Sequence, residues 1–175
     1  MISNTHRHVV SVAVCGLLLL VTSIKNSIAA NRTHGTPTDP DACALLTTAE
    51  ASAALGVTSL AGARLVASSP KACIWSDDPN HGVGHRRVTL SIMQVAAFQF
   101  GKSGANTRIK IEPVSGIGDE AYYELFTSDS PFLVVRKGSA AFNVRILNGG
   151  KLKPFTLDEE KTKEADLAKA AASRL

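Results

Sequence analysis

The first thirty residues carry the pattern of an export signal, and this limits which part of the chain can form a folded core. Arg7 provides a short positive region, and the apolar run 9–21 that follows it is too short to span a bilayer comfortably. Residues 27–30, Ser-Ile-Ala-Ala, supply the small residues that a signal peptidase recognises. We therefore expect residues 1–30 to be a signal peptide, cleaved after Ala29 or Ala30, and the protein to be periplasmic or extracellular.

The remaining chain has the size of one ordinary domain. Residues 31–41 contain Pro37 and Pro40 without periodicity and are expected to be a flexible linker, which leaves 42–175 as a single α+β domain. Removal of Arg7 and Lys25 with the leader lowers the basic residues from 19 to 17 against 15 acidic ones, a net charge of +2. This near-neutral balance, with scattered basic residues, argues against nucleic-acid binding.

Cysteine usage fits an exported domain. Cys15 lies in the apolar run and leaves with it; bulky Val14 precedes Cys15, so a lipoprotein site and a stable membrane anchor after cleavage are not expected. Cys43 and Cys73 remain as an even pair in an oxidising compartment, which predicts one disulfide. The rival interpretation is a pair of free or metal-binding thiols.

Two helices are marked by capping signals. Thr47 with Glu50 forms a capping box before a helix that ends at Gly56. Thr156 with Glu159 forms a second box before the C-terminal helix. One stripe of that helix is apolar only in its C-terminal half, so we expect that half to dock on a sheet and the first turns to stay in water. The stripe comprises Leu157, Lys161, Glu164, Ala165, Ala168, Ala172 and Leu175.

Strand signals fill the space between the two helices. Alternation is clearest in Val88–Val95, and Gly138-Ser139 is a hairpin turn between the last two candidates. We predict an α+β fold in which five or six antiparallel strands carry the N-terminal and C-terminal helices on one face. The candidate strands are Arg64–Ser68, Ala72–Ser76, Val88–Val95, Lys110–Val114, Glu120–Leu125, Phe132–Lys137 and Ala140–Leu147, and Ala96–Lys102 is a possible helical turn bearing Phe98.

Four local patterns occur here in a fixed order. They are Asp41-Ala42-Cys43-Ala44-Leu45-Leu46-Thr47-Thr48-Ala49-Glu50, Cys73-Ile74-Trp75, Gly116-Ile117-Gly118-Asp119-Glu120-Ala121 and Val134-Val135-Arg136-Lys137-Gly138. Together they resemble a family of small exported proteins and lipoproteins of unknown function, best known from actinobacteria. The resemblance implies a helix-flanked antiparallel sheet, a paired Cys43–Cys73 and an envelope location, and it carries no catalytic residues. This chain departs from the family in lacking a usable lipobox.

One segment carries metal-ligand chemistry. Asp77, Asp78, His81 and His85 lie within nine residues and are the candidate ligands for a divalent metal. The segment is also rich in Pro, Asn and Gly, the residues that a loop between two strands contains anyway. We therefore predict neither a metal nor a cofactor here, and no catalytic residues elsewhere.

Aromatic residues mark a possible contact surface. Trp75 is expected to pack in the core beside Cys73. Tyr122 and Tyr123 are adjacent in a strand, so they should point to opposite faces, one buried and the other exposed or lining a groove. Phe126 and Phe132 bracket the turn 127–130 and would offer apolar surface there.

Three functional hypotheses follow from these features. We favour a monomeric, non-enzymatic protein that binds an unknown envelope protein or cell-wall component. The alternative is a small carrier that holds an apolar ligand between the sheet and the C-terminal helix, where Ala165, Ala168 and Ala172 leave room. A metal-dependent hydrolase is the third, and it requires the four ligand candidates to converge.

Overall fold

The computed structural model describes residues 40–81, 84–126, 131–149 and 152–175. The signal-peptide prediction and nearly all of the predicted linker lie outside these residues. Residues 37–175 belong to one compact unit. Among the described residues, no helix is long and apolar enough to cross a membrane.

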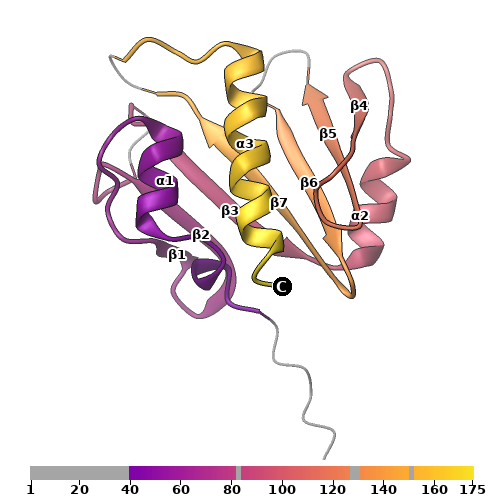
Figure 1. Ribbon diagram of the computed structural model, residues 1–175, viewed down its shortest axis with the longest axis horizontal. Helices are drawn as coiled ribbons and strands as arrows, with labels where there is room; N and C mark the ends of the chain where they lie inside the picture. The colour runs from indigo at the N-terminus through magenta and orange to yellow at the C-terminus, as the bar shows by residue number, and fades with distance from the viewer. Residues whose placement is uncertain (1–39, 82–83, 127–130, 150–151) are drawn as a thin grey trace, which may run out of the picture. The chain divides into compact units, whose positions relative to one another are not determined.

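A single antiparallel sheet forms the body of this α+β fold (Figure 1). Its strands, in spatial order β1-β2-β3-β7-β6-β5-β4, number seven, so the predicted five or six was too low. All seven candidate segments form strands. The short edge strand β1 is joined to β2 by a tight turn. The strands are β1 (Ala63–Val66), β2 (Ser69–Ser76), β3 (Arg87–Met93), β4 (Ile109–Val114), β5 (Glu120–Phe126), β6 (Phe132–Lys137) and β7 (Ala140–Leu147).

The strand order places the last strand in the middle of the sheet. β1, β2 and β3 form one consecutive antiparallel set, and β4 to β7 form another. Pairing of β7 with β3 joins the two sets, with Leu90 opposite Val144 and Val88 opposite Ile146. These four side chains are fully buried, because the period-two alternation of both strands directs them to the same face.

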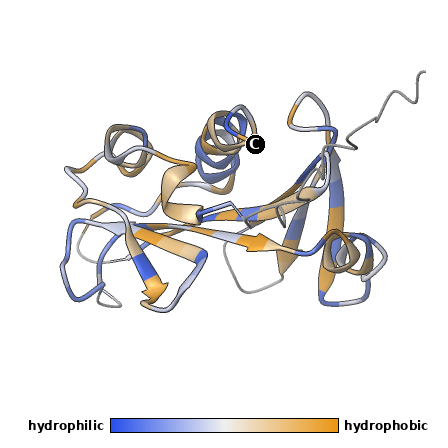
Figure 2. Ribbon diagram, turned by 90° about the horizontal axis from the view of Figure 1, so that it is seen from below, coloured by the Kyte–Doolittle hydropathy of each residue, from blue (hydrophilic) through white to orange (hydrophobic). Residues whose placement is uncertain are grey.

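Helices α1 (Thr48–Leu55) and α3 (Leu157–Ala172) lie on that face of the sheet (Figures 1 and 2). Both predicted capping boxes are present, with Thr47 and Glu50 at α1 and Thr156 and Glu159 at α3. Gly56 ends α1 in the left-handed conformation at φ 67°. A short 3-10 helix, η1 (Ala42–Ala44), precedes α1.

The predicted disulfide between Cys43 and Cys73 is present and ties η1 to β2. It closes a loop between residues 30 positions apart, which contributes about 3–4 kcal/mol in the chain-entropy model. Trp75, two residues along the same strand, is buried with Cys73. The backbone at Gly62 packs closely against both side chains. A Cβ at this position would lie only 2.6 Å from Trp75 Nε1 and 2.9 Å from Cys73 Sγ, so a larger residue would clash.

The second face of the sheet is also partly covered, which corrects the prediction of helices on one face only. The segment 96–102, expected to be one helical turn, belongs to α2 (Val95–Lys102), which connects β3 in the middle of the sheet to β4 at its edge. On the way it packs against β6 and β7, on the side opposite α1 and α3 (Figure 2). Phe98, fully buried, contacts the Tyr122 ring at 5.0 Å between centroids.

The prediction that the first turns of α3 stay in water holds for residues 157–159, which are exposed, and is wrong for the turn that follows. Glu160 and Glu164 are buried, and Leu157 is half exposed. The pairing of β6 with β7 ends at Leu133–Val144, so the next amides of β7 on that side need other partners. Glu164 accepts a hydrogen bond from the Ile146 amide at 2.8 Å, and Glu160 accepts one from the Asn148 side chain.

Arg86 is a buried cation that joins three segments. It is 8 % exposed, and its Nη1 donates to the carbonyl of Leu55, at the C-terminal end of α1, at 2.9 Å. Its Nη2 donates to the carbonyl of Lys153, and its guanidinium carbon lies 3.9 Å from the centre of the Phe155 ring. A guanidinium is favoured at a helix C-terminus because the carbonyls there carry partial negative charge.

We predict that Arg86→Met destabilises the protein by about 2–4 kcal/mol, because it leaves buried carbonyls without donors. The neighbouring Arg87→Met is the matched control: Arg87 is half exposed, so its loss should cost less than about 1 kcal/mol. Urea denaturation followed by circular dichroism measures both. Equal losses in the two variants would contradict the assignment of Arg86 as the internal clamp.

Candidate functional site

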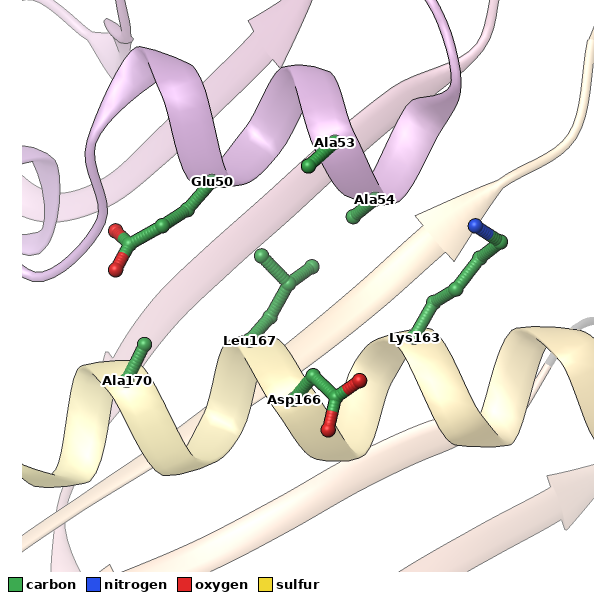
Figure 3. A pocket seen from close by; sticks show the side chains of 7 residues that line it. All are labelled: Glu50, Ala53, Ala54, Lys163, Asp166, Leu167 and Ala170. Carbon is green, nitrogen blue, oxygen red and sulfur yellow. The ribbon is translucent and has the colours of Figure 1, made fainter.

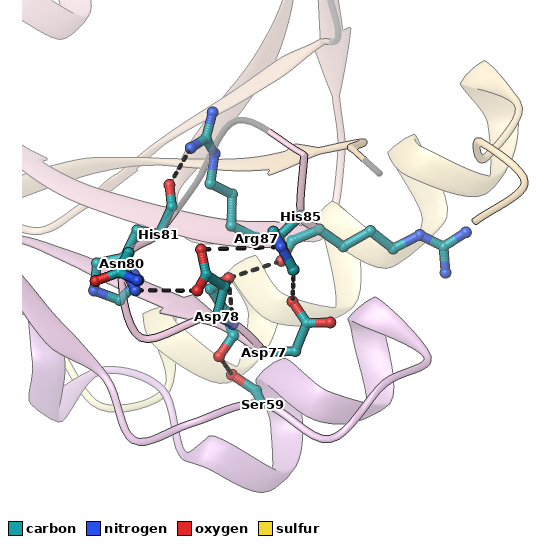
Figure 4. A network of polar contacts seen from close by, with 9 residues as sticks. Ser59, Asp77, Asp78, Asn80, His81, His85 and Arg87 are labelled. Atoms are coloured by element: carbon teal, nitrogen blue, oxygen red, sulfur yellow. Dashed lines mark hydrogen bonds and ion pairs between the residues drawn. The ribbon is translucent and has the colours of Figure 1, made fainter. Parts of the chain in front are cut away.

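The predicted metal-ligand segment forms a polar network in the loop between β2 and β3 (Figure 4). His85 Nδ1 lies 3.1 Å from Asp77 Oδ1, and His85 Nε2 lies 4.0 Å from Asp78 Oδ2. His81 lies on the other side of Asp78, and its carbonyl accepts a hydrogen bond of 2.7 Å from Arg87 Nη1. The loop thus brings one histidine to two carboxylates and keeps the other away.

Much of this network serves the backbone of the loop itself. Asp78 Oδ1 accepts from the Asn80 amide at 3.2 Å, and Ser76 Oγ accepts from the Asp78 amide at 3.2 Å. Ser76 also donates to the carbonyl of Arg86 at 3.3 Å. Within the described part of the chain, no three His, Cys, Asp or Glu side chains form a group that could hold a metal ion. The geometry therefore fits a loop stabilised by side chain-to-backbone hydrogen bonds.

The two tyrosines of the predicted contact surface are both buried, so neither is exposed; of the two predicted alternatives, lining a groove holds for Tyr122, which lines a cavity of about 350 Å³ beside β4. They do point to opposite faces: the Tyr122 hydroxyl donates to the carbonyl of Phe98 at 2.9 Å, and the Tyr123 hydroxyl donates to that of Lys161 at 2.6 Å. Burial raises the pKa of both hydroxyls far above the ordinary value. Each tyrosine is therefore a core residue beneath its own helix, α2 or α3.

The two phenylalanines of that surface do come together. Phe126 at the end of β5 and Phe132 at the start of β6 are half exposed, and their ring centroids lie 5.7 Å apart in an edge-on arrangement. The guanidinium carbon of Arg145, on β7, lies 4.1 Å from the centre of the Phe132 ring. We call Phe126, Phe132 and Arg145 the aromatic-arginine stack. Sequence reasoning did not include Arg145, although its place in the alternation of β7, between buried Val144 and Ile146, puts it on the opposite face.

The stack lies beside a stretch of polar side chains on the face that carries α2. Pairing places Thr89 opposite Arg145, Ser91 opposite Asn143, and Arg87 opposite Leu147. All six are half exposed, unlike the residues beneath α2. We define the open face as Arg87, Thr89 and Ser91 of β3, Asn143, Arg145 and Leu147 of β7, and the two phenylalanines.

A groove of about 310 Å³ runs between α1 and α3 (Figure 3). Its apolar lining consists of Ala53 and Ala54 from α1 and Leu167 and Ala170 from α3. Charged side chains stand around it, namely Glu50, Lys163 and Asp166. An apolar floor with a charged rim is suited to an amphipathic ligand.

The carboxylate of Glu50, at one end of the groove, is ionised and already paired with a cation. Arg174 Nη2 lies 2.8 Å from Glu50 Oε1, and this contact lowers the pKa of Glu50 to about 2. The groove lies beside α3, whereas the hypothesis of an apolar carrier placed its ligand beneath that helix. Beneath α3, the side chains of Leu167, Ala168 and Ala171 are buried against the core.

Glu164 is the most strongly perturbed carboxyl among the described residues with a resolved pKa shift. It is fully buried, and burial raises its pKa to about 9; the Ile146 amide and Arg145 oppose this increase, and the nearby Glu160 adds to it. Its Oε1 accepts the Ile146 amide, and its Oε2 has no hydrogen-bond partner. Glu164 does not line the groove between α1 and α3, so its position fits docking of the helix on β7.

No protein-family model, no curated protein and no solved structure matches this chain. The resemblance to the exported family therefore stays a prediction from the four motifs.

Protonation of Glu164 makes stability depend on pH. Its folded pKa is raised above the unfolded one, so the folded state keeps a proton that the unfolded state releases, and stability falls as the pH rises from about 5 to about 9. Glutamine at this position cannot ionise. We therefore predict that the free energy of unfolding of Glu164→Gln, relative to that of the wild type, rises by about 2–4 kcal/mol when the pH is raised from about 5 to about 8. Urea denaturation at both pH values measures the difference.

Glu50→Gln is the control for this effect. The pKa of Glu50 is lowered to about 2, so Glu50 is ionised in the folded and unfolded states throughout this pH range. Its substitution should change stability equally at the two pH values. A Glu164→Gln variant that behaves in the same way would show that Glu164 is ionised in the folded protein.

Proposed function

We propose that this protein is an exported, non-enzymatic binding protein of the cell envelope, located in the periplasm or outside the cell. The leader-like sequence of residues 1–30 supports export. The Cys43–Cys73 disulfide fits an oxidising location. The polar side chains of the β2–β3 loop hydrogen-bond to the loop's own backbone, which supports a structural role for the one segment rich in ligand-type residues.

The aromatic-arginine stack is the observation that carries this proposal. Arginine and phenylalanine are both enriched in protein interfaces, and arginine is also enriched at their energetically dominant positions. Here Phe132 holds the Arg145 guanidinium at 4.1 Å, and Phe126 supports Phe132 from the side. An arginine already stacked on a ring loses less side-chain entropy on binding, so the stack is prepared for a contact. The partner is proposed to be an envelope protein.

Site-specific photo-cross-linking tests this proposal in the organism that produces the protein. We predict that p-benzoyl-phenylalanine at position 132 gives one discrete cross-linked species, identified by mass spectrometry as a single partner protein. The matched control is the same group at Phe100 on α2, which is 83 % exposed and therefore more accessible than Phe132.

Arg145→Ala should abolish the adduct formed at position 132, because it removes the cationic member of the stack. The same smear of products at positions 132 and 100, or an adduct that survives Arg145→Ala, would contradict a specific interface at this surface.

The groove between α1 and α3 favours a second candidate function, the carriage of a small apolar ligand. Its volume of about 310 Å³ is at the lower end of the range for small-molecule sites, and its floor is made of alanine and leucine side chains. A ligand with a short apolar chain and a cationic group would fit this floor and the exposed carboxylate of Asp166, since Glu50 is already paired with Arg174.

A fluorescent apolar probe, N-phenyl-1-naphthylamine, tests the carrier. If the groove carries apolar ligands, the probe should bind with a blue-shifted emission, and Ala53→Trp, which fills the groove from its exposed α1 side, should weaken binding at least about tenfold. Ala49→Trp is the control, since Ala49 is an exposed α1 residue that does not line the groove. Absence of probe binding, or equal loss in both variants, would rule the carrier out.

A further inference from the structure

Two arginines of the open face carry charge that the described residues do not neutralise. Arg145 contacts the Phe132 ring and forms no hydrogen bond or ion pair with a described residue. Arg87 donates to a backbone carbonyl, that of His81, and is likewise without a carboxylate partner in the described part of the chain. The buried Nε atoms of both arginines have no hydrogen-bond acceptor. Because the Nε atoms are buried, an anionic partner would contact the terminal Nη atoms, which have no carboxylate partner in the described part of the chain.

Several other cations of the domain are paired with carboxylates, although Arg86, for example, donates to backbone carbonyls instead. Arg64 lies 2.5 Å from Asp41, Arg174 lies 2.8 Å from Glu50, and Lys161 lies 2.8 Å from Glu112. At the opposite end of β6, five more charged residues form a network: Lys102 and Arg136 contact Glu120, and Lys137 contacts Asp119. Against this background of internal pairs, the open face is a local excess of positive charge.

Strand pairing sets the two arginines at a useful spacing. Arg87 is opposite Leu147, and Arg145 is opposite Thr89, so the arginines are diagonal neighbours on β3 and β7. Diagonal neighbours on one face lie roughly 7–8 Å apart at their backbones, within reach of carboxylates on one short segment. Thr89, Ser91 and Asn143 add hydroxyl and amide groups along the same strands.

Apolar side chains border the arginines on both sides. Leu147 lies beside Arg87 across the β3–β7 pair, and Phe132 lies beneath the guanidinium of Arg145. This alternation of cationic and apolar groups matches a peptide that alternates acidic and apolar residues. A uniformly charged carbohydrate would leave Leu147, Phe126 and Phe132 without contacts.

We propose that the open face binds an acidic segment of a partner protein, with Arg87 and Arg145 contacting its carboxylates and Phe132 contacting an apolar residue between them. This inference rests on the proposed function and adds the chemistry of the partner. Bidentate pairing of a guanidinium with a carboxylate supplies the specificity, and the adjacent ring excludes water from the contact.

Peptide titration followed by ¹⁵N NMR tests this inference on the exported protein with its disulfide intact. The probe is an acetylated and amidated peptide with three glutamates on each side of one phenylalanine; its lysine counterpart is the charge control. We expect the acidic peptide to shift the Nε–Hε resonances of Arg87 and Arg145. Arg87→Gln with Arg145→Gln should weaken binding at least about tenfold, and Arg108→Gln, at an exposed arginine outside the open face, should not.

Several results would overturn this inference. They are equal binding of both peptides, equal loss in the Arg108→Gln variant, arginine-dependent binding of alginate but not of the peptide, and an arginine-dependent dimer in sedimentation experiments. Absence of peptide binding together with a discrete adduct at position 132 would overturn the acidic partner and leave the proposed function standing. Absence of both would overturn both.

Discussion

The structure depends first on the pairing of β7 with β3. These strands lie far apart in the sequence, and their ladder is the connection between the set β1–β3 and the set β4–β7. The two strands bury Val88, Leu90, Val144 and Ile146 on one face. The same register sends Arg87, Thr89 and Arg145 to the other face. One pairing thus builds both the core and the surface that we assign to binding.

Glutamate side chains of α3 supply hydrogen-bond acceptors at the end of β7. β7 extends beyond its pairing with β6, so its end has backbone groups without a strand partner on that side. Glu164, on the helix above, accepts a hydrogen bond from the backbone amide of Ile146, and Glu160 accepts one from the side-chain amide of Asn148 just beyond the strand. Burial of a carboxyl is costly, and the raised pKa of Glu164 is the physical sign of that cost. The hydrogen bond to the Ile146 amide offsets part of this cost, because a buried amide without an acceptor would also be unfavourable.

Local features of the fold could be predicted from the sequence, and features set by distant contacts could not. The capping boxes at Thr47 and Thr156 depend on residues three positions apart, so the sequence contains the whole interaction. The burial of both Tyr122 and Tyr123 was missed, because one of the two is covered only when α2, the connection from β3 to β4, packs on the second face of the sheet. Arg145 was missed for a similar reason: a strand pattern places it on a face, but only the β6–β7 pairing puts Phe132 beneath it.

Hydrogen exchange of the backbone amides, resolved by NMR, tests the central role of the β3–β7 pairing most directly. We predict that the paired amides of β3 and β7 exchange most slowly, and that β2 and β6 share the same opening free energy as one cooperative unit. If the strands β4–β6 instead exchange at least about tenfold faster than β1–β3, the two sets open independently. That result would contradict the claim that this one pairing holds the sheet together and fixes the open face.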